Sequence, residues 1–448
     1  MKHNHQKAHI VAVDMGYGHQ RAASPLRKAC CHSALVNANS YTGIPKADRD
    51  IWNQSRKMYE FFSRFKKVPV LGEIAWDVFD KFQEIQPFYP KRDLSAPTIQ
   101  LKSTYSLIKK KKWGKHLIDK LAKNPIPIVS TFFIPAFMAD VFNYPGEIYC
   151  LCTDTDVSRA WAPLDPKKSK IKYFAPNYRV EQRLKMYGVN PDNIFVTGFP
   201  LPDELVGGAK ETKLRKYLGE RLYNLDPKKI YLKRYYDSIG EHLGKSNFPP
   251  KKHHPLTIMF AIGGAGAQRE LGVTILKSLK QDIQQDKIRM ILVAGVHNQV
   301  NTFFKKEIRE LGMANELKQN KIKIIFSQTK MDYFNKFDKA LRHTDILWTK
   351  PSELSFYTAL GIPIIMSEPI GSQEHFNRRW LKAIGSGTTM EDPRYTNQWL
   401  FDWLESGWFA EAAMNGFLEA STSAVQNIDK ILSHRPEETS KIKTILQY

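Results

Sequence analysis

Two short apolar runs in this chain each lead into a glycine-rich loop and then into a stretch of helical composition. The first run is HIVAV at residues 9–13, followed by DMGYGH, and the second begins at residue 256 as LTIMFAIGGAGA. The glycines after each run permit a tight turn. A strand, a glycine loop and a helix in this order open a doubly wound parallel sheet. We therefore expect one such sheet in each half of the chain.

Further strand-like runs follow each opening unit at intervals that leave room for helices. They lie at 126–131, 147–154, 170–176 and 193–200, and then at 289–295, 321–327, 345–351 and 362–368. This alternation predicts an α/β fold. We expect an N-terminal domain at 1–204, a linker or insertion at 205–255, a second domain at 256–394, and C-terminal helices at 395–448. One arrangement for these last helices is packing back on the first domain.

Charge indicates the chemistry of the partners. The 448 residues include 67 Lys and Arg against 45 Asp and Glu, a formal net charge of +22. Such a surface attracts nucleic acid, anionic headgroups or phosphorylated substrates, although it can also serve solubility alone. Region 50–125 is aromatic, basic and helical, with Met58, Phe61, Phe62 and Phe65 at helical spacing. An amphipathic basic helix of this kind can lie on an anionic bilayer. The alternative is a helix whose apolar side packs against the protein core while its basic side faces solvent.

Membrane and redox signals are weak. No stretch approaches about 20 clean apolar residues and no signal peptide is visible, so any membrane contact is expected to be peripheral. The four cysteines, Cys30, Cys31, Cys150 and Cys152, lack the spacing of a disulfide framework. Cys150 and Cys152 lie in an apolar run, and we interpret them as small buried residues of a reduced, cytosolic protein. No second Cys/His pair stands at finger spacing, so no metal site is predicted.

The first loop carries a candidate catalytic residue. Gly16 and Gly18 let the backbone turn after the strand, and His19 stands at the start of the following helix. Ligands of doubly wound sheets bind at this place, and a histidine there can act as a general base near neutral pH. A histidine without a chemical role is the alternative, because such a loop motif is weak alone.

The loop IGGAGAQRE, at residues 262–270, carries the candidate phosphate site. Gly263, Gly264 and Gly266 follow an apolar strand, and backbone N–H groups at such a place can hold a diphosphate. The loop is neither a Walker A loop nor a GxGxxG fingerprint. A plain tight turn is the alternative.

Two predicted helix starts add polar groups in the same half. Lys350, Ser352 and Glu353 follow a strand, and the Glu353 carboxylate can accept hydrogen bonds from a ribose diol. Gln373 and Asn377 share a helix face and can bind sugar hydroxyls together. Capping of the helix and an ordinary polar surface are the respective alternatives.

These motifs together resemble the GT-B glycosyltransferases of family 28, which include diacylglycerol glycosyltransferases. DMGYGHQRAA looks like the family's N-terminal loop, and residues 152–201 look like its segment that closes the acceptor domain. GGAGAQ looks like the donor loop, and KPSELSFYTALGIPII with GSQEHFNRRWL looks like the nucleotide-sugar helix and its tail. The resemblance implies two Rossmann-like domains that face a central cleft, and inverting sugar transfer without a bound metal or other cofactor.

The resemblance also implies residue roles. His19 would be the base, and Gly16, Tyr17, Gly18 and Asp154 would lie on the acceptor side. The donor UDP-sugar would contact Gly263, Gly264, Gly266, Gln268, Phe326, Lys350, Ser352, Glu353, Gln373, Glu374 and Asn377. Two positions depart from the family: Tyr17 replaces a glycine, and Phe356 stands where the ribose-binding glutamate is usual unless a two-residue deletion lets Glu353 take that role.

The leading hypothesis is a cytoplasmic, peripherally membrane-associated hexosyltransferase of glycolipid synthesis. It would move a sugar from a UDP-sugar to a lipid or lipid-linked acceptor at an anionic membrane surface. A UDP-sugar epimerase or a soluble-acceptor transferase of the same fold is the alternative among enzymes. A non-catalytic or nucleic-acid-binding protein is the alternative of another class, but no nucleic-acid recognition motif is present, so no nucleic-acid partner is expected.

Overall fold

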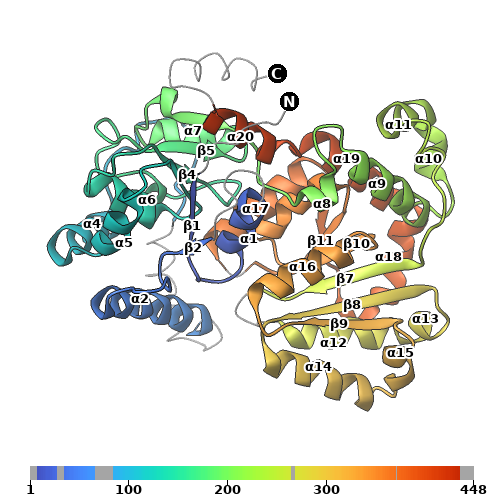
Figure 1. Cartoon of the computed structure of the whole chain (residues 1–448). Coiled ribbons are helices and arrows are strands. Elements are labelled where there is room, and N and C mark those ends of the chain that lie inside the picture. Colours follow the sequence, from blue (N-terminus) through green and yellow to red (C-terminus); the bar gives the residue numbers. More distant parts are fainter. Residues whose placement is uncertain (1–7, 28–34, 66–83, 264–267, 370, 434–448) are drawn as a thin grey trace. The chain divides into compact units, whose positions relative to one another are not determined.

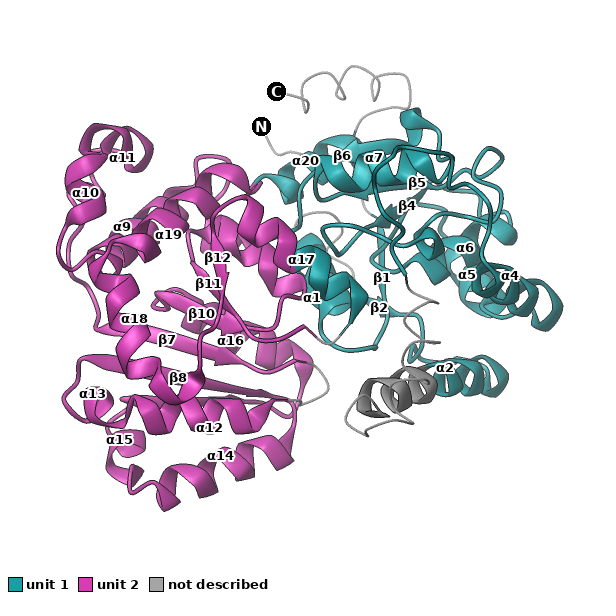
Figure 2. Cartoon of the chain, turned by 180° about the vertical axis from the view of Figure 1, so that it is seen from behind, with its two compact units in different colours: residues 1–201, 370–377, 423–448 teal, residues 202–369, 378–422 magenta. Residues whose placement is uncertain are grey.

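The computed structural model describes residues 8–27, 35–65, 84–263, 268–369 and 371–433, and it describes the backbone alone at 56–65. The chain forms two compact units, coloured separately in Figure 2. Unit 1 comprises residues 1–201, 370–377 and 423–448, and unit 2 comprises 202–369 and 378–422. Each unit contains one six-stranded sheet in which every pairing is parallel.

The sheet of unit 1 has the order β2-β1-β3-β4-β5-β6. Its strands are β1 (His9–Ala12), β2 (Val36–Asn37), β3 (Ile128–Ser130), β4 (Ile148–Leu151), β5 (Lys172–Ala175) and β6 (Ile194–Val196). Strands β3 and β4 are buried along their whole length, as expected for parallel strands covered on both faces. Cys150 and Cys152 are buried free thiols in this core, which confirms their interpretation as small buried residues.

Helices alternate with these strands (Figure 1). They are α1 (Gly18–Leu26), α2 (Lys46–Phe65), α4 (Ile99–Lys111), α5 (Lys115–Ala122), α6 (Phe133–Val141), α7 (Tyr178–Met186) and α20 (Ala424–Ser433), with 3-10 turns η2 (Arg159–Trp161) and η3 (Pro191–Asn193). The helix predicted around Met58 is α2, but its side chains from 56 on lie outside the described residues. Helix α20 is tied to the sheet of unit 1 because Asn427 Nδ2 donates to the Thr197 carbonyl at 3.1 Å.

The sheet of unit 2 has the order β12-β11-β10-β7-β8-β9. Its strands are β7 (Leu256–Ala261), β8 (Ile288–Gly295), β9 (Ile322–Phe326), β10 (Ile346–Thr349), β11 (Ile364–Met366) and β12 (Gly387–Thr389). Strand β7 pairs with β8 on one side and with β10 on the other. This is the strand order of a dinucleotide-binding Rossmann sheet.

Helices lie on both faces of this second sheet, with α12 and α14 on one face and α16 on the other (Figure 1). The helices are α8 (Asp203–Val206), α9 (Thr212–Leu225), α10 (Ile230–Arg234), α11 (Tyr236–Leu243), α12 (Arg269–Ser278), α13 (Lys280–Gln284), α14 (Asn298–Glu310), α15 (Ala314–Lys318), α16 (Lys330–Leu341), α18 (Thr396–Glu405) and α19 (Trp408–Glu419), with 3-10 segments η4 (Glu353–Leu360) and η5 (Pro393–Tyr395). Helix α17 (Ser372–Ala383) has its first half in unit 1 and its second half in unit 2.

The segment 205–255 is part of the body of unit 2. Leu214, Leu218, Leu222 and Leu225 of α9 are buried, since they repeat at helical spacing on one face. Arg221 on the same helix donates to the carbonyls of Thr344 at 2.7 Å and Leu360 at 2.8 Å. Of the helices expected at 395–448, α18 and α19 belong to unit 2 and α20 belongs to unit 1.

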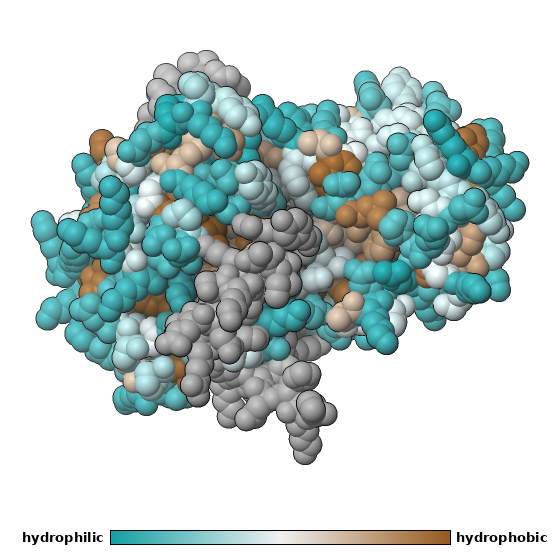
Figure 3. All heavy atoms as spheres, turned by 90° about the horizontal axis from the view of Figure 1, so that it is seen from above, coloured by the Kyte–Doolittle hydropathy of each residue, from teal (hydrophilic) through white to brown (hydrophobic). Residues whose placement is uncertain are grey.

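One face of the molecule is drawn in Figure 3. Hydrophilic residues predominate on the face drawn in Figure 3, and hydrophobic residues appear there in separate groups. Among the described residues, every helix is too short or too polar to span a bilayer.

Candidate active site

The loops after β1 and β3 meet at the point where the strand order of unit 1 reverses. Strand β1 lies between β2 and β3. The chain therefore continues from β1 to β2 on one side of β1, and then crosses over to β3 on the other side. His19, on the first turn of α1, has its Nδ1 2.7 Å from the carbonyl oxygen of Thr131, which follows β3. The Thr131 hydroxyl donates back to the His19 carbonyl at 2.9 Å. Open α/β sheets bind their ligands at such a reversal, beyond the carboxyl ends of the strands.

The contact with Thr131 determines the state of the His19 ring. A carbonyl oxygen can only accept, so Nδ1 carries a proton and donates it, and Nε2 carries the lone pair of the neutral ring. The half-buried ring lies 4.7 Å from the ring of Phe132, between centroids. Burial lowers the pKa of His19 to about 4, although the hydrogen bond to Thr131 acts in the opposite direction. His19 is therefore neutral at physiological pH, as a general base must be.

Asn39 holds the loop that precedes His19. The Asp14 backbone N–H donates to Asn39 Oδ1 at 2.8 Å, and Asn39 Nδ2 donates to the Asp14 carbonyl at 3.1 Å. Gly16 is exposed with a φ of +87°, a conformation that favours glycine. Tyr17 is buried and stands at the N-cap of α1, and Gly18 is the first residue of that helix. Sequence reasoning missed Asn39 because it acts from a separate loop after β2.

Asp154 lies in the same unit and contacts one of the residues predicted on the donor side. Asn377 is buried; its Nδ2 donates to Asp154 Oδ1 at 3.1 Å. Its Oδ1 accepts from the Thr155 N–H at 2.9 Å and from the Thr155 hydroxyl at 2.8 Å. The structure thus places Asp154 and Asn377 together, and the Asn377 amide already makes three hydrogen bonds within unit 1.

The loops after β7 and β10 meet at the reversal of the second sheet. Gly263 follows β7, and Lys350 follows β10. A Cβ placed on Gly263 would overlap Cε of Lys350, so the absence of a side chain at 263 lets the lysine lie against the backbone. An ammonium group beside glycine-rich backbone at the carboxyl end of a strand suits a phosphate. The predicted phosphate-binding residues Gly264 and Gly266 lie outside the described residues.

Gln268 connects this loop to a third strand end. It precedes α12 with a φ of +68°. Its Oε1 accepts from the Ser367 hydroxyl at 2.9 Å, and its Nε2 donates to the Glu368 carbonyl at 3.2 Å. Ser367 follows β11 and was not among the predicted site residues, because a single serine after a short strand carries no distinctive signal.

The helix predicted after Pro351 is the 3-10 segment η4, which begins at Glu353. Ser352 is its N-cap residue, and both Ser352 and Glu353 are half-buried. Phe356, at the place of the family's usual glutamate, is 4% exposed, and its ring lies 5.4 Å from that of Trp380. Glu353 is thus the acidic residue at the start of this segment, and Phe356 packs in the interior of unit 2.

Three further donor-side residues were predicted. Phe326 is the half-buried last residue of β9. Gln373 and Glu374 lie in the first turn of α17, where Gln373 is half-buried and Glu374 is buried. The helix start predicted for this motif is therefore present.

The chain is similar in sequence to several known proteins. A family model described as "Domain of unknown function (DUF6938)" matches residues 249–415. The chain is 22% identical over 383 residues to the processive diacylglycerol beta-glucosyltransferase of Bacillus subtilis, covering 84% of this chain and 81% of the relative. With the enzyme of the same name from Bacillus licheniformis, it shares 23% identity over 388 residues and the same coverage. The chain is a distant homologue of these glycosyltransferases.

This glycosyltransferase homologue has the GT-B fold class predicted from its sequence, with one doubly wound parallel sheet in each unit. Among solved structures, it is similar to the UDP-GlcNAc 2-epimerase of Neisseria meningitidis bound to UDP-GlcNAc, with a TM-score of 0.42 and 14% identity over 82% of this chain and 88% of that chain.

Proposed function

We propose that this chain is an inverting glycosyltransferase that moves a sugar from a UDP-sugar to a hydroxyl of a lipid or lipid-linked acceptor at the cytoplasmic membrane surface. The observation that carries the proposal is the neutral His19, held by Thr131 at the reversal of the first sheet. The named activity of the relatives, processive transfer of glucose to diacylglycerol, supports a lipid acceptor.

The chemistry requires a base and a stabilised leaving group. The acceptor hydroxyl oxygen attacks the anomeric carbon of the sugar and forms a new C–O bond, while the bond from that carbon to the phosphate oxygen breaks. UDP leaves with the electron pair, and the hydroxyl proton passes to Nε2 of His19. The Lys350 ammonium and the backbone N–H groups near Gly263 would stabilise the diphosphate as its charge increases.

The excess of basic residues supports the membrane part of the proposal. The formal charge of +22 favours anionic headgroups. The acceptor of the relatives is itself a membrane lipid, so an enzyme with a similar acceptor must approach the bilayer surface.

The test is sugar transfer by the purified full chain. UDP-glucose, UDP-galactose and UDP-GlcNAc are each supplied with diacylglycerol in anionic phosphatidylglycerol vesicles, and lipid products are identified by mass spectrometry. We expect a glycosylated lipid from one donor. His19→Ala should lower the rate by about 100-fold or more, the usual contribution of a general base, while calorimetric UDP affinity stays unchanged.

His116→Ala is the matched control, since His116 is an exposed histidine of the same unit. It should retain full activity. Unchanged turnover in His19→Ala would contradict the role of His19. Conversion of UDP-GlcNAc to its 2-epimer without any acceptor would favour the epimerase alternative instead.

A further inference from the structure

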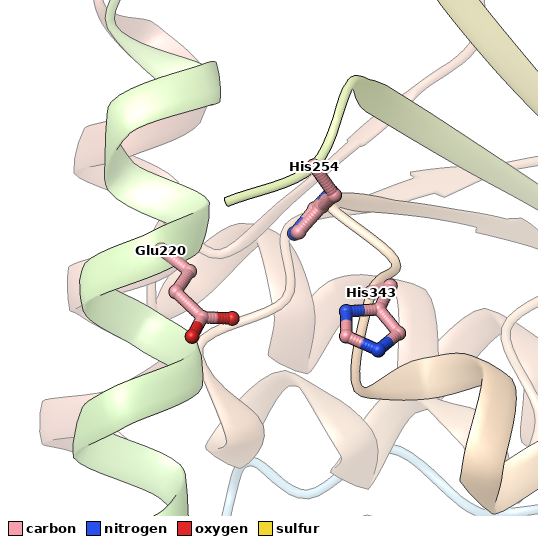
Figure 4. Close-up of side chains that lie close together, drawn as sticks. All are labelled: Glu220, His254 and His343. Carbon is pink, nitrogen blue, oxygen red and sulfur yellow. The ribbon is translucent and has the colours of Figure 1, made fainter. Parts of the chain in front are cut away.

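Three segments of unit 2 bring two imidazoles and a carboxylate together at the amino ends of its strands. Glu220 belongs to α9, His254 precedes β7, and His343 lies in the turn between α16 and β10 (Figure 4). One ligand atom from each side chain lies within 4.8 Å of the other two. In Figure 4 the carboxylate and the two rings approach a common space between the helix and the two loops.

Glu220 is a buried carboxylate whose hydrogen-bonding capacity is not filled within its unit. The residue is 8% exposed, and its Oε2 has no hydrogen-bond partner among the described residues. His253 Nδ1 lies 3.8 Å from that oxygen, and Lys216 Nζ lies 4.0 Å from Oε1. A buried carboxylate oxygen without a donor is costly, and a bound cation would remove that cost.

The ring of His254 is already oriented for binding through one nitrogen. Its Nδ1 lies 3.0 Å from the Pro255 carbonyl and 3.6 Å from Oδ2 of Asp345. The Pro255 carbonyl oxygen can only accept a hydrogen bond from Nδ1–H, so Nε2 is the nitrogen that presents a lone pair. Asp345 is itself buried and held by the Thr257 N–H at 2.8 Å. Histidines that bind metals commonly donate their other N–H to a carbonyl or carboxylate in this way.

We propose that Glu220, His254 and His343 bind a divalent transition-metal ion, for which zinc is the best match. Two imidazoles and one carboxylate are a known zinc ligand set, with His253 or water in the fourth position. Ligands at zinc-bond length in a tetrahedron lie about 3.3 Å apart, so atoms that lie within 4.8 Å of one another need to close by at most about 1.5 Å. His343 is exposed, and its ring lies 5.4 Å from that of His254, between centroids.

The proposed metal site is distinct from the donor-side residues of the same sheet. His254 and His343 precede the first residues of β7 and β10, whereas Gly263 and Lys350 follow the last residues of those strands. The ion would join α9 to both strand entries and stabilise unit 2. This inference does not depend on the proposed function.

The experiment measures zinc bound by the full chain after dialysis against EDTA. Titration with zinc chloride in a calorimeter, metal analysis and thermal melting are performed on the wild type, Glu220→Gln and His343→Ala. We expect a bound zinc equivalent in the wild type that raises the melting temperature of unit 2. Both variants should lose that equivalent or bind it at least tenfold more weakly. Cobalt in place of zinc should give the visible absorption of a tetrahedral site in the wild type only.

His116→Ala again serves as the control, because it removes an exposed histidine from unit 1 and should retain the equivalent. His343→Ala is the decisive variant, since an exposed side chain can be removed without harm to the core. The inference is overturned if the wild type binds no zinc equivalent that raises its melting temperature. Equal binding and equal stabilisation in His343→Ala would overturn it as well.

Discussion

Asp156 shows how a single buried charge is compensated in unit 1. Its Oδ1 lies 2.8 Å from Arg183 Nε, and its Oδ2 lies 2.9 Å from Arg183 Nη2 and 3.0 Å from Arg179 Nε. The side chains of Arg183 and Asp156 are 0% and 2% exposed. Asp156→Ala would leave the Arg183 guanidinium buried without its carboxylate. We expect the free energy of unfolding of unit 1 to fall by about 3–5 kcal/mol, measured by urea denaturation.

Asp165→Ala is the comparison for that prediction. The pair of Asp165 and Lys168 spans 3.3 Å, with side chains 51% and 85% exposed. Its removal should cost less than about 1 kcal/mol, because solvent screens exposed pairs. Similar losses in the two variants would show that the Asp156 contacts are not compensating a buried charge.

The lowered pKa of His19 predicts that the stability of the fold depends on pH. This pKa is lowered from 6.5 to about 4 in the folded chain. Between these values the unfolded chain binds a proton on this ring and the folded chain does not. The contribution of His19 to stability is therefore complete above pH 6.5 and is lost as the pH falls toward 4.

Nuclear magnetic resonance of labelled histidine measures this titration directly. We expect an imidazole with a midpoint near 4 that is absent from His19→Ala and that carries its proton on Nδ1 in the neutral form. A midpoint near 6.5 for His19 would contradict the burial of its ring in the native fold.

At the scale of whole elements, helix α19 packs closely against η4 at Gly416. Gly416 lies within α19, and a Cβ there would overlap Oγ1 of Thr358 and stand 2.5 Å from its carbonyl oxygen. Alanine favours a helix over glycine by about 1 kcal/mol, but here it must push the helix away from η4. We expect Gly416→Ala to lower the free energy of unfolding of unit 2 by about 1–3 kcal/mol, as measured by urea denaturation.

Leu418→Ala on the same helix is the control, since that side chain is 48% exposed and should change stability by less than about 0.5 kcal/mol. A gain of stability in Gly416→Ala would mean that helix propensity outweighs the close packing of α19 on η4.

At the scale of the whole molecule, we expect UDP to stabilise one of the two units and not the other. The proposed diphosphate contacts near Gly263 and Lys350 lie in unit 2. In scanning calorimetry of the full chain, UDP at 100 times its dissociation constant should stabilise that unit by about 2.7 kcal/mol and raise its transition. A UDP concentration series that leaves every transition unchanged would contradict a donor site in unit 2.

The division into units also shows where sequence reasoning succeeded and where it failed. The ten predicted strand runs correspond to β1 and to β3 through β11. Strands β2 and β12 were missed, because VN and GTT are too short and too polar to appear as apolar runs. The segment 205–255 seemed separate by composition, yet α9 packs its buried leucines into unit 2. Composition counts the exposed polar residues of that segment together with its buried ones, so it does not reveal that one face of α9 is buried.

The sequence by itself determined the strand runs, the two glycine loops and the position of His19 at a helix start, because apolar periodicity and glycine act through neighbours in the chain. Only the tertiary structure decided that His19 meets Thr131, that Gly263 meets Lys350, and that Glu220, His254 and His343 converge. These contacts depend on the order of strands in each sheet, which brings distant loops to a common edge. Strand order is settled by the packing of the whole unit, and no local pattern encodes it.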